Sequence, residues 1–147
     1  MNSNAMHSVI HRRSFVALSL VAACGQRSSD RCAHCGMSVR SDSRWRAGAT
    51  VDGRAVLFDA PRCLFQYRHA GGHGPLRDPW VIEYYGPTER RTPATEVRYV
   101  AGSRQRGPMG PDVVPVAPAM VERFRRDHGG REPLEYEAIT TAVIDGL

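Results

Sequence analysis

This 147-residue sequence contains a Cys-x-x-Cys motif followed by Gly and Met, at residues 32–37, whose side chains could bind a metal ion. Two cysteines at this spacing place two sulfur atoms within reach of one ion, and the glycine lets the backbone turn tightly beside them. Zinc ordinarily takes four nitrogen or sulfur ligands, and the sequence has no second Cys-x-x-Cys. The methionine adds a soft thioether donor, and soft donors favour Cu(I) over harder ions. We therefore predict a soft-metal site with Cys32, Cys35 and Met37 as ligands.

Three further residues could add donors to this site. Met109 lies in a Gly-Pro-Met-Gly-Pro segment without the apolar periodicity that surrounds a core methionine such as Met120, so we interpret it as a ligand. His34 lies between the two cysteines and could bind the ion, although its position also suits an exposed loop. Cys63 lies on the apolar face of an expected helix, where it is either a buried small hydrophobe or an additional ligand.

The same residues also allow interpretations in which the protein binds no metal. Cys32 and Cys35 could form a disulfide outside the cytoplasm. A redox-catalytic Cys-x-x-Cys normally opens a helix after a strand, whereas this one precedes the first expected strand. The sequence contains no lysine, no nucleophile elbow, no HExxH and no glycine-rich phosphate loop, so we do not expect an enzyme. The arginines at 123–131 alternate with acidic residues, as on a solvated helix face, so we expect no nucleic-acid partner.

The N-terminus has the layout of a secretory signal. Residues 11–23 contain an arginine pair followed by about ten apolar residues, fewer than the roughly 20 that span a bilayer. The run ends in Val-Ala-Ala before Cys24, which resembles the cleavage box of bacterial lipoproteins and implies lipidation of Cys24. We therefore predict a signal peptide at 1–23, with Met6 as a possible start, and a tether at 24–31. Loss of Arg12 and Arg13 lowers the formal charge from +5 to +3. Three thiols then remain, an odd number that cannot all pair within the chain.

The elements that must position these residues follow a repeated pattern. Alternating apolar residues at 45–51, a turn at Asp52-Gly53 and an apolar run at 54–58 predict a hairpin. A helix is expected from Pro61 to the glycines at 71–72, with Asp59 as its cap. Histidines 69, 73 and 128 lie at helix ends, where they would meet the negative end of the helix dipole.

The segment 56–61 aligns with 113–118 at an offset of 57, and both copies lead into helices that end in Gly-Gly. Strand-like runs at 80–85 and 95–100 precede the second copy, and a closing strand or helix is possible at 134–144. We predict an α+β domain at 32–147, made of two small related strand-strand-helix(-strand) halves at roughly 32–78 and 79–147. Residues 73–79 are the expected link.

Five segments, in order along the chain, resemble the NosL family of lipid-anchored proteins associated with nitrous oxide reductase. They are Cys24 in its cleavage box, the Cys-x-x-Cys-Gly-Met motif, Phe58-Asp59 followed by Cys63, Gly-Pro-Met-Gly at 107–110 running into 113–115, and His-Gly-Gly at 128–130. The resemblance implies a monomeric Cu(I) chaperone, held by a lipid in the cell membrane and facing the periplasm. It also implies delivery of copper to nitrous oxide reductase or its membrane assembly complex.

The resemblance further implies two ββαβ halves similar to a domain of the organomercurial lyase MerB. Cys32, Cys35, Met37 and Met109 match the family's motifs by position. Two alternatives stay open. One is a thiol- or organometal-handling enzyme related to MerB, which would need a thiol of low pKa. The other is a structural lipoprotein with a Cys32–Cys35 disulfide and no metal.

Overall fold

The computed structural model describes residues 30–147. The expected signal peptide, the lipidation site Cys24 and most of the tether lie outside the described residues. None of the helices within 30–147 combines the length and the apolar character that crossing a bilayer requires.

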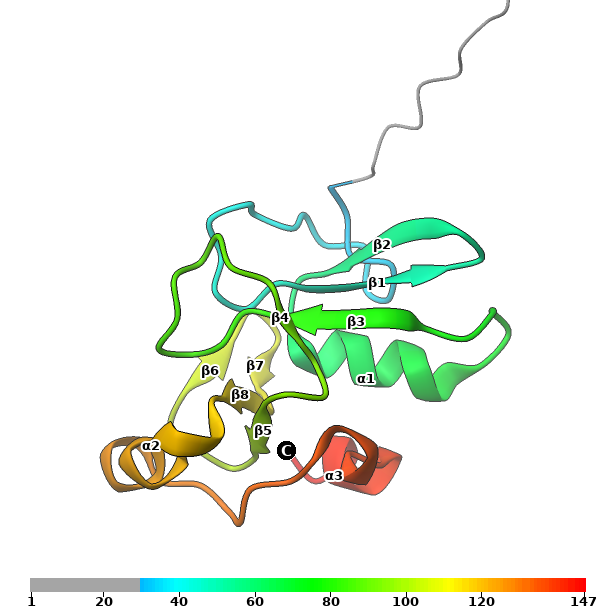
Figure 1. Cartoon of the computed structure of the whole chain (residues 1–147). Helices are drawn as coiled ribbons and strands as arrows, with labels where there is room; N and C mark the ends of the chain where they lie inside the picture. The colour runs from blue at the N-terminus through cyan, green and yellow to red at the C-terminus, as the bar shows by residue number, and fades with distance from the viewer. Residues whose placement is uncertain (1–29) are drawn as a thin grey trace, which may run out of the picture.

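The first sheet is built on the predicted hairpin. Strands β1 (Ala47–Val51) and β2 (Arg54–Phe58) pair antiparallel, from Ala47 opposite Phe58 to Val51 opposite Arg54. The turn between them has φ of 48° and 74°, and two positive values are what a two-residue type I′ hairpin turn requires. Strand β3 (Arg77–Val81) pairs with the other edge of β1, and β4 (Thr92–Pro93) pairs with β3. The strand order is therefore β2-β1-β3-β4 (Figure 1).

Helix α1 (Pro61–Ala70) lies along this sheet and ends, as predicted, at Gly71, whose φ is 69°. The expectation that Asp59 caps α1 is wrong. The N-cap residue is Ala60, and the amide of Arg62 donates to Oδ1 of Asp112 at 2.8 Å, so the cap comes from a residue 50 positions away. Asp59 turns toward the cysteines.

The histidines at the helix ends behave differently from one another. His73 donates from Nε2 to the Tyr67 carbonyl in the last turn of α1 at 2.6 Å, as the helix-dipole argument predicts. Its bonds to the carbonyls of Gly74 and Tyr67 raise the pKa of the imidazole. His69 instead contacts the Ile139 carbonyl at 2.8 Å, and His128 contacts the Tyr84 hydroxyl at 3.4 Å. Among these three histidines, His73 alone bonds through its ring to the last turn of the helix beside it.

The second half repeats the order of the first. Strand β5 (Arg98–Val100) pairs antiparallel with β8 (Val114–Val116), which leads through a 3-10 turn (Pro118–Met120) into α2 (Val121–His128). Leu134 then pairs with Tyr99 on the free edge of β5, as β3 pairs with β1. This arrangement confirms the predicted α+β class, with strand, strand and helix in the same order twice, while the closing strand of the second half is reduced to the single Leu134–Tyr99 bridge.

Two features of the second half differ from the prediction. A short hairpin of β6 (Arg106–Gly107) and β7 (Gly110–Pro111) is inserted between β5 and β8. The expected division between residues 78 and 79 falls inside β3, which belongs to the first sheet because it pairs with β1. The expected strand at 80–85 accordingly begins at Arg77 and ends at Val81.

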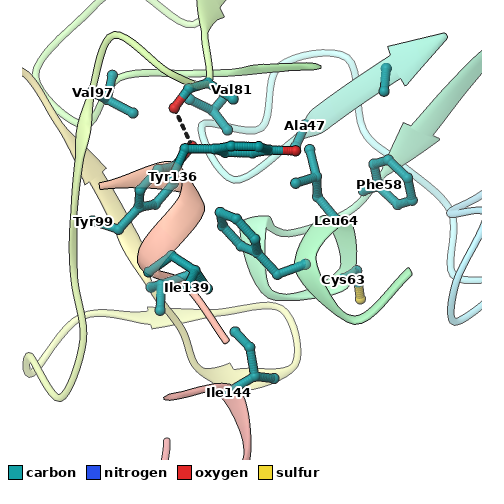
Figure 2. Packing of buried hydrophobic residues seen from close by; sticks show 14 of the residues in the cluster. Ala47, Phe58, Cys63, Leu64, Val81, Val97, Tyr99, Tyr136, Ile139 and Ile144 are labelled. Carbon is teal, nitrogen blue, oxygen red and sulfur yellow. Dashed lines mark hydrogen bonds between the residues drawn. The ribbon is translucent and has the colours of Figure 1, made fainter. Parts of the chain in front are cut away.

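The core joins the two halves through aromatic side chains (Figure 2). Phe65 of α1 packs edge-on against Tyr99 of β5, with ring centroids 5.0 Å apart, and lies 5.3 Å from the Tyr136 ring. Tyr136 belongs to a 3-10 turn (Tyr136–Ala138) that precedes the short helix α3 (Thr141–Asp145), so the closing element is helical. Arg68 donates to the Tyr136 and Ile139 carbonyls at 3.0 and 2.8 Å. These contacts fix α1, and with it the first turn that carries Cys63.

Candidate metal centre

Four side chains converge where β2 passes into α1. They are Cys32, Cys35, Asp59 and Cys63, and their donor atoms all lie within 4.8 Å of one another. Cys63 is fully buried, Cys32 and Asp59 are each 3% exposed, and Cys35 is half-buried. The three cysteines are free thiols. We call this group the thiol cluster.

Backbone hydrogen bonds hold the Cys-x-x-Cys loop against the end of β2. The Cys32 amide donates to the Met37 carbonyl at 2.7 Å, and the Gly36 amide donates to the Cys32 carbonyl at 2.9 Å. Gly36 has a φ of 76°, a left-handed conformation that favours glycine, as the sequence motif predicts. The Ala33 amide donates to the Leu57 carbonyl at 2.8 Å, which ties the loop to β2. Because Asp59 follows β2 directly, the loop and the carboxylate meet there.

The first turn of α1 supplies the third sulfur. Cys63 lies one helical turn after Asp59 in the chain, and residues four apart at a helix end share one side. Cys63 is fully buried and belongs to the packed core (Figure 2). Cys63 packs in the core and its sulfur is also part of the thiol cluster, so its burial is confirmed and its role as a ligand stays a prediction.

The three thiols differ in acidity. A hydrogen bond from the Cys63 thiol lowers the pKa of Cys32 to about 6, against the opposing effect of burial. The pKa of Cys63 is strongly raised, because its thiol donates to Cys32 and is itself buried. Burial also raises the pKa of Cys35, whose thiol donates to Oδ1 of Asp59 at 3.5 Å. Cys32 is therefore the thiol of the cluster that loses its proton most readily.

This acidity can be tested on the reduced, metal-free protein. The ultraviolet absorbance of the thiolate is expected to rise with a midpoint near pH 6, the pKa of Cys32. In Cys63→Ala the midpoint should move up toward about 8.5, the value of an ordinary cysteine, because the donating thiol is gone. Cys35→Ser is the matched control and should leave the midpoint near its original position. An unchanged midpoint in Cys63→Ala would show that Cys63 is not the donor.

Asp59 completes the donor set and was missed at the sequence level as a site residue. Its Oδ2 is buried and has no hydrogen-bond partner. A buried carboxylate oxygen without a partner is costly, and a cation would satisfy it. The sequence signal was an acidic residue directly after an apolar strand and four positions before Cys63. Local spacing made a helix cap the simpler reading.

The other candidate ligands are exposed side chains. Met37 and Met109 are the large hydrophobic side chains that the described residues leave exposed, at 42% and 44%. Met37 follows Gly36 at the surface, and Met109 lies at the tip of the β6–β7 hairpin. His34 is exposed. Three thiols and one carboxylate can hold a soft or borderline cation without these residues, because thiolate is the ligand that such ions select.

The fold and the site together define a class: a small α+β domain with a buried, thiol-rich cluster that could hold a metal ion. The NosL family model matches residues 25–144, so the chain belongs to the NosL family. The fold is similar to the crystal structure of the copper chaperone NosL from Shewanella denitrificans, with a TM-score of 0.66 and 21% sequence identity. That match covers 78% of this chain and 92% of the other. No curated protein sequence matches the chain.

Proposed function

We propose that this protein is a copper carrier that holds one Cu(I) at the thiol cluster. The observation that carries this proposal is the convergence of Cys32, Cys35 and Cys63, from two separate segments, on one buried point. Soft thiolate ligands select Cu(I) over hard cations. The likeness to a structure described as a copper chaperone supports the same conclusion.

Each residue of the cluster has a role in this proposal. The Cys32 thiolate attracts the cation, Cys35 is the half-buried thiol through which the ion enters, and Cys63 is the inner ligand. Cys35 and Cys63 bind the ion as thiolates, so their two protons are released to water on binding, and the Asp59 carboxylate, which accepts from the Cys35 thiol at 3.5 Å, is left facing the cation. The buried sulfurs shield the ion from water and oxidants, while Cys35 leaves a route for release.

The two exposed methionines are better suited to passing a copper ion to another protein than to holding it. A thioether is a weak, soft ligand and carries no charge, so it can share an ion without trapping it. Met37 lies two residues beyond Cys35, and Met109 lies on a hairpin that is hydrogen-bonded to the first turn of α1. We place both in the path between the thiol cluster and a receiving protein.

The destination of the ion follows from the N-terminus and the family. Lipidation of Cys24 would hold the chain on the cell membrane, facing the periplasm. Cys24 precedes Cys32 by eight residues, which reach about 28 Å when fully extended. The cluster would therefore work close to the membrane surface. Nitrous oxide reductase or its membrane assembly complex is the proposed recipient, and a monomer suffices for this role.

A competition titration tests the proposal. The reduced, detergent-solubilised protein is titrated with Cu(I) in the presence of a coloured Cu(I) chelator. We expect one equivalent of Cu(I) to be withheld from the chelator. Complete capture of the ion by a chelator of micromolar affinity would overturn the carrier function. Mass spectrometry of protein purified from membranes checks the lipid on Cys24.

A second candidate function is thiol-based organometal chemistry, and the lowered pKa of Cys32 favours it. A reactive thiolate is the feature such an enzyme needs. Multiple turnovers of an organomercurial by the copper-free protein at neutral pH would support this function. Stoichiometric uptake without turnover would leave the carrier as the function.

A further inference from the structure

Asp112 lies in the interior, between the hairpin that carries Met109 and the helix that carries Cys63. It is 2% exposed and comes directly after β7. Its Oδ1 accepts from two backbone amides, those of Arg62 and Val113, each at 2.8 Å. Arg62 also donates from Nη1 to the Pro111 carbonyl at 3.4 Å. Two hydrogen bonds thus join the end of the hairpin to the residue beside Cys63.

The second oxygen of Asp112 faces the hairpin itself. Oδ2 is buried without a partner, and a Cβ built on Gly107 would lie 2.7 Å from it. Gly107 is the last residue of β6, so the carboxyl group is packed between β6 and the start of α1. Any larger residue at 107 would displace the carboxyl group. Burial raises the pKa of Asp112 to about 7, with Arg62 opposing this effect and Asp59 adding to it.

The hairpin cannot hold this position by itself. Strands β6 and β7 share two residue pairs, Arg106 with Pro111 and Gly107 with Gly110. A two-stranded hairpin of this size is at best marginally stable in water without outside packing. Its tip, with Met109, is exposed, so the contacts that orient it come from its base. Figure 1 shows the base beside the start of α1.

We propose that Asp112 is a positioning residue for metal transfer, which holds the Met109 hairpin against the first turn of α1 so that the Met109 thioether reaches an ion held by the thiol cluster. This inference rests on the proposed function. It assigns the coupling between the methionine and the cysteines to one buried carboxyl group.

A double-mutant cycle tests the coupling. Met109→Ala and Asp112→Ala are each expected to slow the transfer of Cu(I) from the loaded protein to an excess of chelator by about 10- to 100-fold, the range for residues that support a metal site. The double variant should transfer the ion no more slowly than the slower single variant, because both changes remove the same interaction. Asp112→Asn mimics the protonated acid, keeps the acceptor for the Arg62 amide and should transfer the ion within about twofold of the original rate. Effects that multiply, or an Asp112→Ala variant that transfers the ion normally, would overturn the inference.

A readout without copper separates this inference from the proposed function. Asp112→Ala should speed hydrogen exchange of the amides of Arg106, Gly107, Met109 and Gly110, and Asp112→Asn should not. Equal exchange in both variants would overturn the inference.

If Asp112→Ala does not fold, Gly107→Ala replaces it, because the added Cβ displaces the carboxyl group. If Cys63→Ala abolishes Cu(I) binding while Met109→Ala has no effect, the carrier function stands and the positioning role falls. If the original protein binds no Cu(I), both fall.

Discussion

Replacement of Cys63 with alanine is expected to lower the Cu(I) affinity of the reduced protein by at least about 100-fold. Loss of an outer-shell partner of a metal ligand typically costs 10- to 100-fold, and loss of a ligand should cost at least as much. The same change removes the hydrogen bond that lowers the pKa of Cys32. More of the Cys32 thiol would then be protonated at neutral pH, which adds proton competition to the loss of a sulfur.

Met120 provides a matched control for this experiment. It lies at the position in the second half that corresponds to Cys63 in the first, at the offset of 57, and it packs against the second hydrophobic cluster. Met120→Ala should therefore lower the stability of the domain without lowering its Cu(I) affinity. Thermal unfolding of both variants checks that each remains folded at the temperature of the titration. A Cys63→Ala variant with the original affinity would remove Cys63 from the ligand set.

Local rules predicted the elements of this fold better than they predicted its site. The Asp52-Gly53 turn requires positive φ, and the glycines at 71 and 129 end their helices at φ of 69° and 72°. Each of these features depends on a few adjacent residues, so the sequence alone is sufficient to identify them. The repeated order of strands and helices follows from the same signals.

The exchange of roles between Asp59 and Asp112 shows where local rules fail. Asp59 has the spacing of a helix cap, but a nearby cysteine thiol donates to it, at 3.5 Å. The cap comes instead from Asp112, which is 50 residues away in sequence and reaches Arg62 only in the folded chain. No short-range pattern distinguishes these outcomes. The deciding factor is which buried donors each carboxylate can reach.

The thiol cluster could also be predicted only in part from the sequence. The apolar periodicity of α1 correctly places Cys63 in the interior. That periodicity does not show that the Cys-x-x-Cys loop also lies beside Cys63, where the hydrogen bond from the Ala33 amide to the Leu57 carbonyl holds it. The exposure of Met109 agrees with the absence of apolar periodicity around it. Its link to α1 is set by the buried carboxyl group of Asp112, which has no sequence signature.

Replacement of Phe65 with alanine is expected to lower the free energy of unfolding by about 3–5 kcal/mol, the range for truncation of a buried phenylalanine. Phe65 is fully buried and makes edge-on contact with Tyr99 at 5.0 Å. Aromatic pairs of this geometry add about 0.5–1.5 kcal/mol beyond the buried area, and the guanidinium of Arg68 lies 5.1 Å from the Phe65 ring centroid. Urea unfolding of the reduced protein gives the free energy directly.

The same experiment shows whether the two halves unfold as one unit. Phe65 belongs to α1 of the first half, while Tyr99 belongs to β5 of the second and Tyr136 to the C-terminal segment. Because one aromatic group joins all three, loss of Phe65 should shift a single cooperative transition rather than split it. Met109→Ala, at an exposed position, is the control and should change the stability by no more than about 0.5 kcal/mol. A loss below about 1 kcal/mol, or a first-half transition separate from the second, would mean that the halves are stabilised independently and that Cys63 is positioned by the first half alone.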